Sequence, residues 1–159
     1  MRPRCDQYYA MVSPVMIDAK NPLYSVNGVF NAIFIHGNVL GDAMFYGSGA
    51  GKLPTASAVV ADVVDCAKNK GRNIMMSWSE EKLNLLQIDD VKSRFFVRVS
   101  GHAAERQSEI EELFGKVEIV AVPSLSEEFA FITGEITEQE YREKAEKLDG
   151  IQSRIRARI

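Results

Sequence analysis

The residues with the clearest chemical potential lie between Gly47 and Thr55, where the sequence reads GSGAGKLPT. Three glycines within five positions allow positive φ angles and let a ligand approach the backbone closely. A helix that starts directly after them would favour a bound anion or polar group at its first turn. A tight turn between a strand and a helix, with no ligand, is the alternative interpretation of the same spacing.

Neither of the two common phosphate-binding patterns is complete at these glycines. The pattern G-x-x-x-x-G-K-[ST] matches at Gly51 and Lys52, but Tyr46 and Leu53 occupy its first and last defining positions. The dinucleotide pattern G-x-G-x-x-G fails because Lys52 stands where its last glycine is required. The sequence therefore does not predict an ATP-type phosphate loop, and Lys52 is interpreted as incidental.

The elements that would position this turn can be predicted from periodicity. Alternating runs rich in β-branched and aromatic residues predict strands at 8–17, 28–37 and 42–47. From Pro54 the period becomes helical, and Pro54 itself suits a first helical turn. The apolar stripe of this helix consists of Val59, Val60, Val63, Val64 and Ala67. Gly71 is the expected end signal.

Residues 74–91 are less regular, and we interpret them as a linker with one short amphipathic helix, in which Trp78 packs between the two halves of the chain. The following half has the order βαββαβ. Its expected elements are a strand at 92–100, a helix at 103–115, strands at 116–123 and 127–136, a helix at 137–150 and a strand at 151–159. Thr137 and Glu140 have the spacing of a capping box at the start of the second helix.

This order predicts a four-stranded antiparallel sheet with two helices on one face. The other face needs a cover, and a second copy of the chain is the simplest one, which predicts a homodimer through the sheet faces. The last strand is expected at a sheet edge. There its arginines, Arg154, Arg156 and Arg158, would discourage edge-to-edge aggregation.

Composition excludes several classes of function. The 159 residues carry a formal net charge of −3, so nothing overall predicts binding to nucleic acid or to an anionic membrane. No apolar run is long enough to span a bilayer, and no signal peptide is predicted. Cys5 and Cys66 fit no metal or redox spacing and are expected as free thiols in the cytoplasm. His36 and His102 form no metal signature, so no metal site is predicted.

Residues 21–65 resemble the C-terminal part of the catalytic domain of homoserine dehydrogenases. The matching positions are Pro22, Leu23, Val26, Gly28, Asn31, Ala32, Gly37, Gly41, Phe45, Gly47, Gly49, Ala50, Gly51, Pro54, Thr55, Ala56, Ala58, Val59, Asp62 and Asp65. The βαββαβ half resembles the ACT domain that follows the catalytic domain in many bacterial members. The resemblance thus implies an α+β chain in which residues 1–73 end a catalytic and dimerisation domain, residues 74–91 link, and residues 92–159 form a ferredoxin-like ACT domain.

For function, the resemblance implies hydride transfer between NAD or NADP and the substrate pair aspartate semialdehyde and homoserine, on the route to threonine and methionine. It places Gly47, Gly49 and Gly51 beside the nicotinamide half of the cofactor, with Gly51 as the expected direct contact. The family's dinucleotide-binding domain and its catalytic carboxylates and lysine have no counterpart in these 159 residues. No catalytic residue is therefore predicted, the chain alone is expected to be inactive, and the preference between NAD and NADP stays open.

The ACT resemblance implies an effector site at the turn after the first strand, with Gly101 and His102 as candidates and threonine as the effector. The Pro-Gly that often follows in amino-acid-binding ACT domains is missing here. A purely structural role in dimer formation is therefore the alternative for this domain. For the whole chain, the alternative is an ACT-type sensing or dimerisation module without catalysis.

Overall fold

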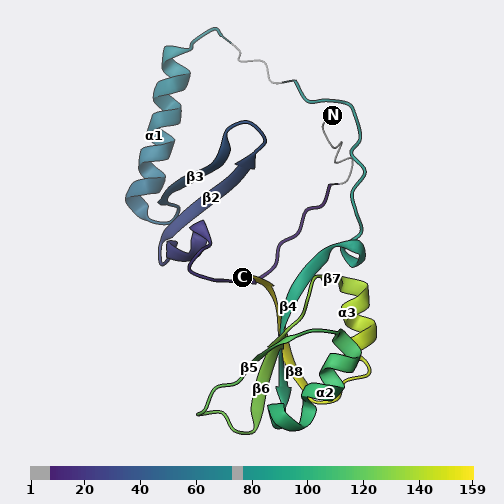
Figure 1. Cartoon of the computed structure of the whole chain (residues 1–159). Coiled ribbons are helices and arrows are strands. Elements are labelled where there is room, and N and C mark those ends of the chain that lie inside the picture. The colour runs from purple at the N-terminus through teal and green to yellow at the C-terminus, as the bar shows by residue number, and fades with distance from the viewer. Residues whose placement is uncertain (1–7, 73–76) are drawn as a thin grey trace. The chain divides into compact units, whose positions relative to one another are not determined.

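The computed structural model describes residues 8–72 and 77–159. The chain divides into two compact units (Figure 1). One unit consists of Ala19–Glu81, and the other combines the segment up to Asp18 with Lys82–Ile159. The N-terminal segment therefore packs with the C-terminal half.

The unit of residues 19–81 contains a hairpin and one long helix. After a 3-10 turn, η1 (Pro22–Ser25), strands β2 (Phe30–Gly37) and β3 (Gly41–Ser48) pair antiparallel along their whole length. Helix α1 (Lys52–Lys68) follows, with Pro54 in its first turn as predicted. Asn69, rather than Gly71, caps its end, because the Asn69 side-chain amide donates to the main-chain oxygen of Asp65 at 3.0 Å.

None of the described side chains of this unit is buried. The valine stripe of α1 is present, but it remains exposed: Val59 is 57%, Val60 61%, Val63 63% and Val64 43% accessible. Apolar helix stripes normally pack against a core. The hairpin and α1 therefore present apolar surface that the described residues of their own unit do not cover.

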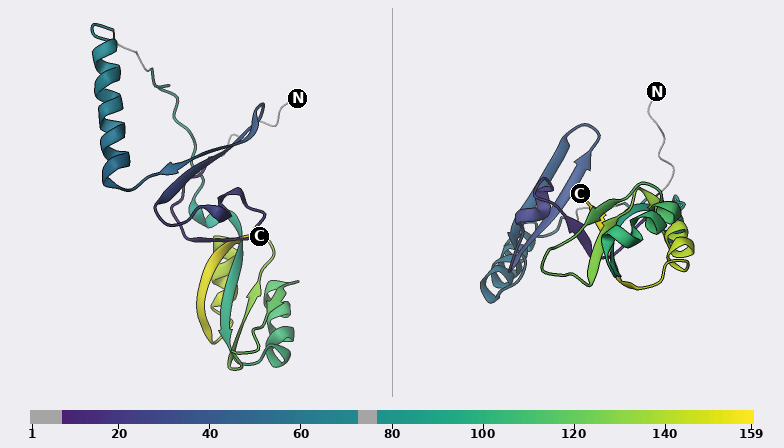
Figure 2. Two further views of the ribbon diagram at one scale, coloured as in Figure 1. Left: turned by 90° about the vertical axis from the view of Figure 1, so that its left-hand side faces the viewer. Right: turned by 60° about the horizontal axis from the view of Figure 1, so that its bottom comes forward.

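The second unit contains the predicted βαββαβ order. Its elements are β4 (Lys92–Ser100), α2 (Ala103–Phe114), β5 (Glu118–Val120), β6 (Glu128–Ile132), β7 (Ile136–Thr137), α3 (Glu138–Ala145) and β8 (Ile151–Arg158). Strands β8, β4, β6 and β5 lie side by side in that order and pair antiparallel. Both helices cover one face (Figure 2). The predicted third strand is split, since β7 pairs separately with the start of β4.

The core lies between that face and the two helices. Phe95, Val97 and Val99 of β4 alternate toward it and are fully buried. The rest of the buried cluster comes from α2, β6, α3 and the loop after α3, and consists of Ile110, Phe114, Phe129, Phe131, Tyr141 and Leu148. This unit thus has its own hydrophobic core, as the alternation in 92–100 predicts.

The expected sheet edge is different in the structure. Strand β1 (Val15–Ile17) pairs parallel with β8, from Val15 opposite Arg156 to Ile17 opposite Arg158, so β8 is an interior strand. Of the predicted strand 8–17, these three residues are regular, and Tyr8 adds one parallel bridge to Leu85. The prediction that the arginine row protects a free edge is therefore wrong.

The linker also differs from its prediction. Its described residues contain one 3-10 turn, η2 (Ile88–Asp90), while 73–76 lie outside the described residues. Trp78 follows these residues, and its expected packing between the two halves of the chain stays a prediction. No helix in the described ranges is long and apolar enough to cross a membrane.

Candidate functional site

The predicted glycine turn joins β3 to α1. Gly47 lies in β3, and Gly49 donates its N–H to the main-chain oxygen of Val29 at 3.2 Å, which fastens the turn to the residue before β2. Gly51 is the N-cap of α1. The structure therefore brings the three glycines together at one exposed strand–helix junction.

Two of these glycines are required by the chain's own geometry. Gly51 has a φ of 133°, which L side chains rarely adopt, and a Cβ there would lie 3.2 Å from Cδ of Pro54. A Cβ at Gly49 would lie 1.5 Å from the side-chain nitrogen of Asn31. By contrast, a Cβ at Gly47 would meet no described atom within 4 Å. Nothing within the described chain therefore requires a glycine at position 47.

The junction offers backbone donors rather than acid–base groups. Gly51 provides no side chain to cap α1, and its carbonyl accepts from both the N–H and the hydroxyl of Thr55, at 3.2 and 2.9 Å. The N–H groups of Lys52 and Leu53 precede any intrahelical acceptor. Such a helix start can hold a polar or anionic group by hydrogen bonds and the helix dipole.

Asn31 is one of the positions that match the homoserine dehydrogenase sequence run, but its contact with the glycine turn was not predicted from the sequence. It lies opposite Gly47 in the β2–β3 register, and its amide fills the space that a side chain at Gly49 would need. The sequence signal that could have indicated this contact is the spacing of Asn31 and Gly49 on either side of the predicted hairpin. Asn31 thus supports the backbone of the turn from the neighbouring strand.

The predicted effector residues, Gly101 and His102, directly follow the end of β4 in the C-terminal unit. Gly101 has a φ of 104° and donates its N–H to the main-chain oxygen of Glu127 at 2.9 Å. His102 is the exposed N-cap of α2 and makes no side-chain cap hydrogen bond. Together with the β5–β6 loop they line a hollow of about 340 Å³ that includes Pro123 and Phe129.

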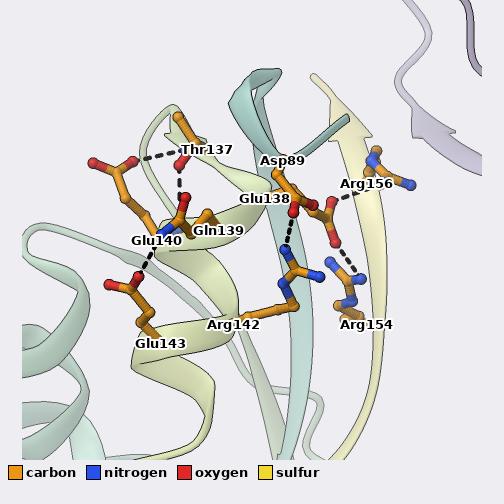
Figure 3. A network of polar contacts seen from close by, with 9 residues as sticks. All are labelled: Asp89, Thr137, Glu138, Gln139, Glu140, Arg142, Glu143, Arg154 and Arg156. Carbon is orange, nitrogen blue, oxygen red and sulfur yellow. Dashed lines mark hydrogen bonds and ion pairs between the residues drawn. The ribbon is translucent and has the colours of Figure 1, made fainter. Parts of the chain in front are cut away.

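A buried carboxylate was missed by the sequence analysis. Glu138, in the first turn of α3, is 5% exposed and forms ion pairs with both Arg154 and Arg156 (Figure 3). The Arg154 guanidinium also lies 4.7 Å from the ring centre of Tyr141 and 5.3 Å from that of Phe95. The register explains this arrangement, because Arg154 and Arg156 stand opposite Val97 and Phe95 and so face the helices.

This network perturbs the titration of Glu138. Burial raises the pKa of this carboxyl, but the hydrogen bonds and positive charges of Arg154 and Arg156 outweigh burial and hold the pKa below its usual value.

The predicted capping box is also present, since Glu140 accepts from the N–H of Thr137 at 2.7 Å and donates its own N–H to the Thr137 hydroxyl. The hydrogen bond that the Glu140 carboxylate accepts from the Thr137 N–H is the largest cause of a lowered pKa for Glu140.

The remaining chemical candidates carry no site. His36 lies in β2 and pairs with Asp42 at 2.5 Å on an exposed surface. In the described part of the chain no group of three or more His, Cys, Asp or Glu could hold a metal ion. Cys66 is a free, exposed thiol, whereas Cys5 lies outside the described residues.

The fold and the glycine junction define an α+β protein in which a hairpin–turn–helix segment is joined to a ferredoxin-like βαββαβ domain. Solved structures share this fold over most of the chain. A homoserine dehydrogenase from Thiobacillus denitrificans aligns over 92% of this chain and 38% of its own, with a TM-score of 0.70 and 24% identity. The Staphylococcus aureus enzyme aligns over 92% of this chain and 37% of its own, with a TM-score of 0.67 and 24% identity.

Sequence comparison leads to the same family. Residues 3–64 match the family model described as homoserine dehydrogenase. The homoserine dehydrogenase of Lactococcus lactis is 42% identical over 94 residues, which are 57% of this chain and 22% of the relative. That of Corynebacterium glutamicum is 54% identical over 61 residues, 38% of this chain and 14% of the relative. The resemblance to homoserine dehydrogenases is therefore confirmed, and the chain spans about a fifth of the length of the first of these relatives.

Proposed function

We propose that this chain is part of a homoserine dehydrogenase, an oxidoreductase that reduces aspartate semialdehyde to homoserine with NADH or NADPH in the cytoplasm. The match of residues 3–64 to the family model carries this proposal. In it, residues 1–73 belong to the catalytic domain, 74–91 link, and 92–159 form an ACT-type domain. A stand-alone sensing module is not adopted, because it leaves the family match of the N-terminal half without a role.

The exposed apolar surface of residues 19–81 supports this assignment. A hairpin and a helix with uncovered valines need a partner surface, and the first of the relatives is more than twice as long as this chain. We infer that the rest of a dehydrogenase domain covers these elements and supplies the main cofactor-binding residues and the catalytic carboxylates and lysine. The described chain alone is then inactive toward aspartate semialdehyde.

The glycine junction would form one wall of the cofactor site. Its donors fit a polar edge of the nicotinamide half, and Gly51, at the start of α1, is the proposed direct contact, with Gly49 and Gly47 beside it. Glycines let the cofactor lie against the backbone, while the N–H groups add polarity without a formal charge. The described residues do not discriminate NADH from NADPH.

A graft tests the assignment directly. The segment of the Corynebacterium glutamicum enzyme that matches residues 3–64 is replaced by the sequence of this chain, and cofactor oxidation with aspartate semialdehyde is followed. We expect the graft to retain turnover. Gly51→Val should lower kcat/KM for the cofactor by at least about tenfold, equivalent to about 1.4 kcal/mol.

Two further variants sharpen this experiment. Lys52→Ala should leave the activity unchanged, because the lysine is not part of a phosphate loop. Gly47→Ala causes no clash within the chain, so a raised KM for the cofactor would place the ligand against that strand. A folded graft without activity, or a Gly51→Val graft with unchanged kinetics, contradicts the proposed role.

We further propose that the ACT-type domain binds threonine at the Gly101–His102 hollow. The Gly101 N–H is already used by Glu127, but α2 has no side-chain cap, so the N–H groups of its first turn can receive an amino-acid carboxylate. Isothermal titration of the chain should show saturable heat with threonine and weaker heat after His102→Ala. A flat titration with threonine removes the effector role and leaves the structural one.

The last part of the proposal is a homodimer through the open faces of the two sheets. That face carries Phe96, Val120 and Ile155, which point away from the helices and are half-buried. Together with neighbouring residues of β6, Phe96 and Val120 line a shallow, mainly apolar hollow. Light scattering should give twice the chain mass, and Phe96→Glu should give the monomer. An unchanged mass for the variant would exclude this face as the interface.

A further inference from the structure

Asn31, on β2, carries a side-chain amide that lies beside the glycines of the strand–helix junction. It stands directly opposite Gly47 in the hairpin, at the end from which the chain continues into α1 (Figure 1). Successive side chains of a strand point to opposite faces, so residues that stand opposite each other across a hairpin share one face. The Asn31 amide therefore lies on the same face of the hairpin as position 47.

The neighbouring glycines leave this amide uncovered. Gly47 has no side chain to cover it from the opposite strand, and a Cβ at Gly49 would lie 1.5 Å from the amide nitrogen, so the amide packs directly on the Gly49 backbone. Within the part of the chain that the structure describes, the amide makes no hydrogen bond, and Asn31 is exposed. Its N–H donors and its carbonyl acceptor are therefore available to a ligand.

This amide adds a function that the rest of the junction does not supply. The first N–H groups of α1, those of Lys52 and Leu53, can only donate. The Thr55 hydroxyl is engaged with the main-chain oxygen of Gly51 at 2.9 Å. The carboxamide of a nicotinamide ring carries an NH2 donor as well as a carbonyl acceptor. The backbone donors suit its carbonyl, and the side-chain carbonyl of Asn31 suits its NH2.

We propose that Asn31 is a specificity-determining residue of the cofactor wall, and that its side-chain carbonyl accepts a hydrogen bond from the carboxamide NH2 of the nicotinamide ring. This inference rests on the proposed function, since it requires the cofactor to lie beside the glycine junction. It also gives Gly47 a role. A side chain at position 47 would stand across the hairpin from Asn31, where a ligand has to approach the amide.

Two cofactors that differ at this one group test the contact. In the acetylpyridine analogue of NAD or NADP, a methyl group replaces the carboxamide NH2, while the carbonyl remains. Calorimetry on the graft in the Corynebacterium glutamicum enzyme measures the binding of both forms, with whichever of NAD and NADP the graft binds more tightly. We expect the natural cofactor to bind at least about fivefold more tightly than the analogue, the size of one net hydrogen bond.

The variant Asn31→Leu identifies the source of this preference. Leucine keeps a side chain of similar size against Gly49 but has no polar atom, so the two forms should bind with affinities within about twofold of each other. Asn38→Leu is the matched control and should keep the preference, because Asn38 is exposed in the turn at the far end of the hairpin. Circular dichroism verifies that both variants fold.

The outcomes separate this inference from the function on which it rests. A folded graft that binds neither NAD nor NADP overturns the proposed function and the inference with it. A graft that binds the natural cofactor and its analogue equally overturns the inference alone. An Asn31→Leu graft that keeps the preference also overturns it, and Asn31 would then only support the backbone of the turn.

Discussion

At the scale of single residues, the glycines of the junction are of two kinds: some are required by contacts or backbone angles within the chain, and one is not. Gly49 and Gly51 are explained by this chain itself, one by the amide of Asn31 and the other by its φ of 133°. Gly47 has no such explanation, since a side chain there would enter open space. A glycine without a local steric cause favours an approach from outside the chain, which fits the proposed cofactor wall.

The position of these glycines between a strand and a helix was predicted from the sequence, but their contacts were not. Periodicity placed them between a strand and a helix, and the structure confirms that position. The contact between Asn31 and Gly49 depends on the register of β2 against β3, which spacing alone does not fix. Which glycine would touch a ligand is likewise a question of three-dimensional approach.

At the scale of elements, β8 shows how a strand pattern can mislead. Its strict alternation of isoleucine and arginine suggests an apolar core face and a charged solvent face. In the structure a bulge between Arg98 and Val99 of β4 changes the register, so that Ile151 packs against the core while Ile155 faces the open side. Arg154 and Arg156 then lie on the helix side, where Glu138 pairs with them. The bulge has no local sequence signal, and the strand predicted at 8–17 carries no signal that β1 pairs with β8.

The ion pairs of Glu138 connect α3 to β8 and lead to a prediction about stability. Glu138→Gln would keep the side-chain volume but remove the charge between two arginines, at a cost of about 1–3 kcal/mol in the free energy of unfolding. Glu146→Gln is the matched control, because Glu146 is exposed at the end of the same helix. Urea unfolding of both variants measures the difference, and equal midpoints would show that the ion pairs contribute nothing.

The same carboxyl predicts the direction of a pH effect. The pKa of Glu138 is lower in the folded state than its ordinary value of 4.5, so the folded state binds this proton less tightly than the unfolded state does. Its contribution is therefore complete above the unfolded pKa and is lost as the pH falls through the folded pKa. Urea midpoints of the wild type should fall more steeply than those of Glu138→Gln as the pH is lowered from about 5. Parallel pH curves would contradict this coupling.

At the scale of the whole molecule, the two units differ in what holds them. The C-terminal unit buries a cluster that extends from Phe95 to Leu148, whereas the described residues of 19–81 bury no side chain. The sequence pattern predicted both sets of elements equally well, since periodicity shows which face is apolar and not what covers it. Whether an apolar stripe is buried depends on the partner surface, and the other described elements of residues 19–81 do not provide one for α1.

This difference predicts how the chain exchanges its amide hydrogens. Amides of β4 and β6 should exchange at the rate set by global unfolding, because their hydrogen bonds lie beside the buried core. Amides of β2, β3 and α1 should exchange far faster in the chain by itself, since few buried contacts oppose their local opening. Mass-spectrometric exchange on the chain, and on the graft in the Corynebacterium glutamicum enzyme, separates the two cases. In the graft the covered α1 should become protected. Strong protection of α1 in the chain alone would mean that these elements form a core of their own, and the inferred need for a covering dehydrogenase domain would then be wrong.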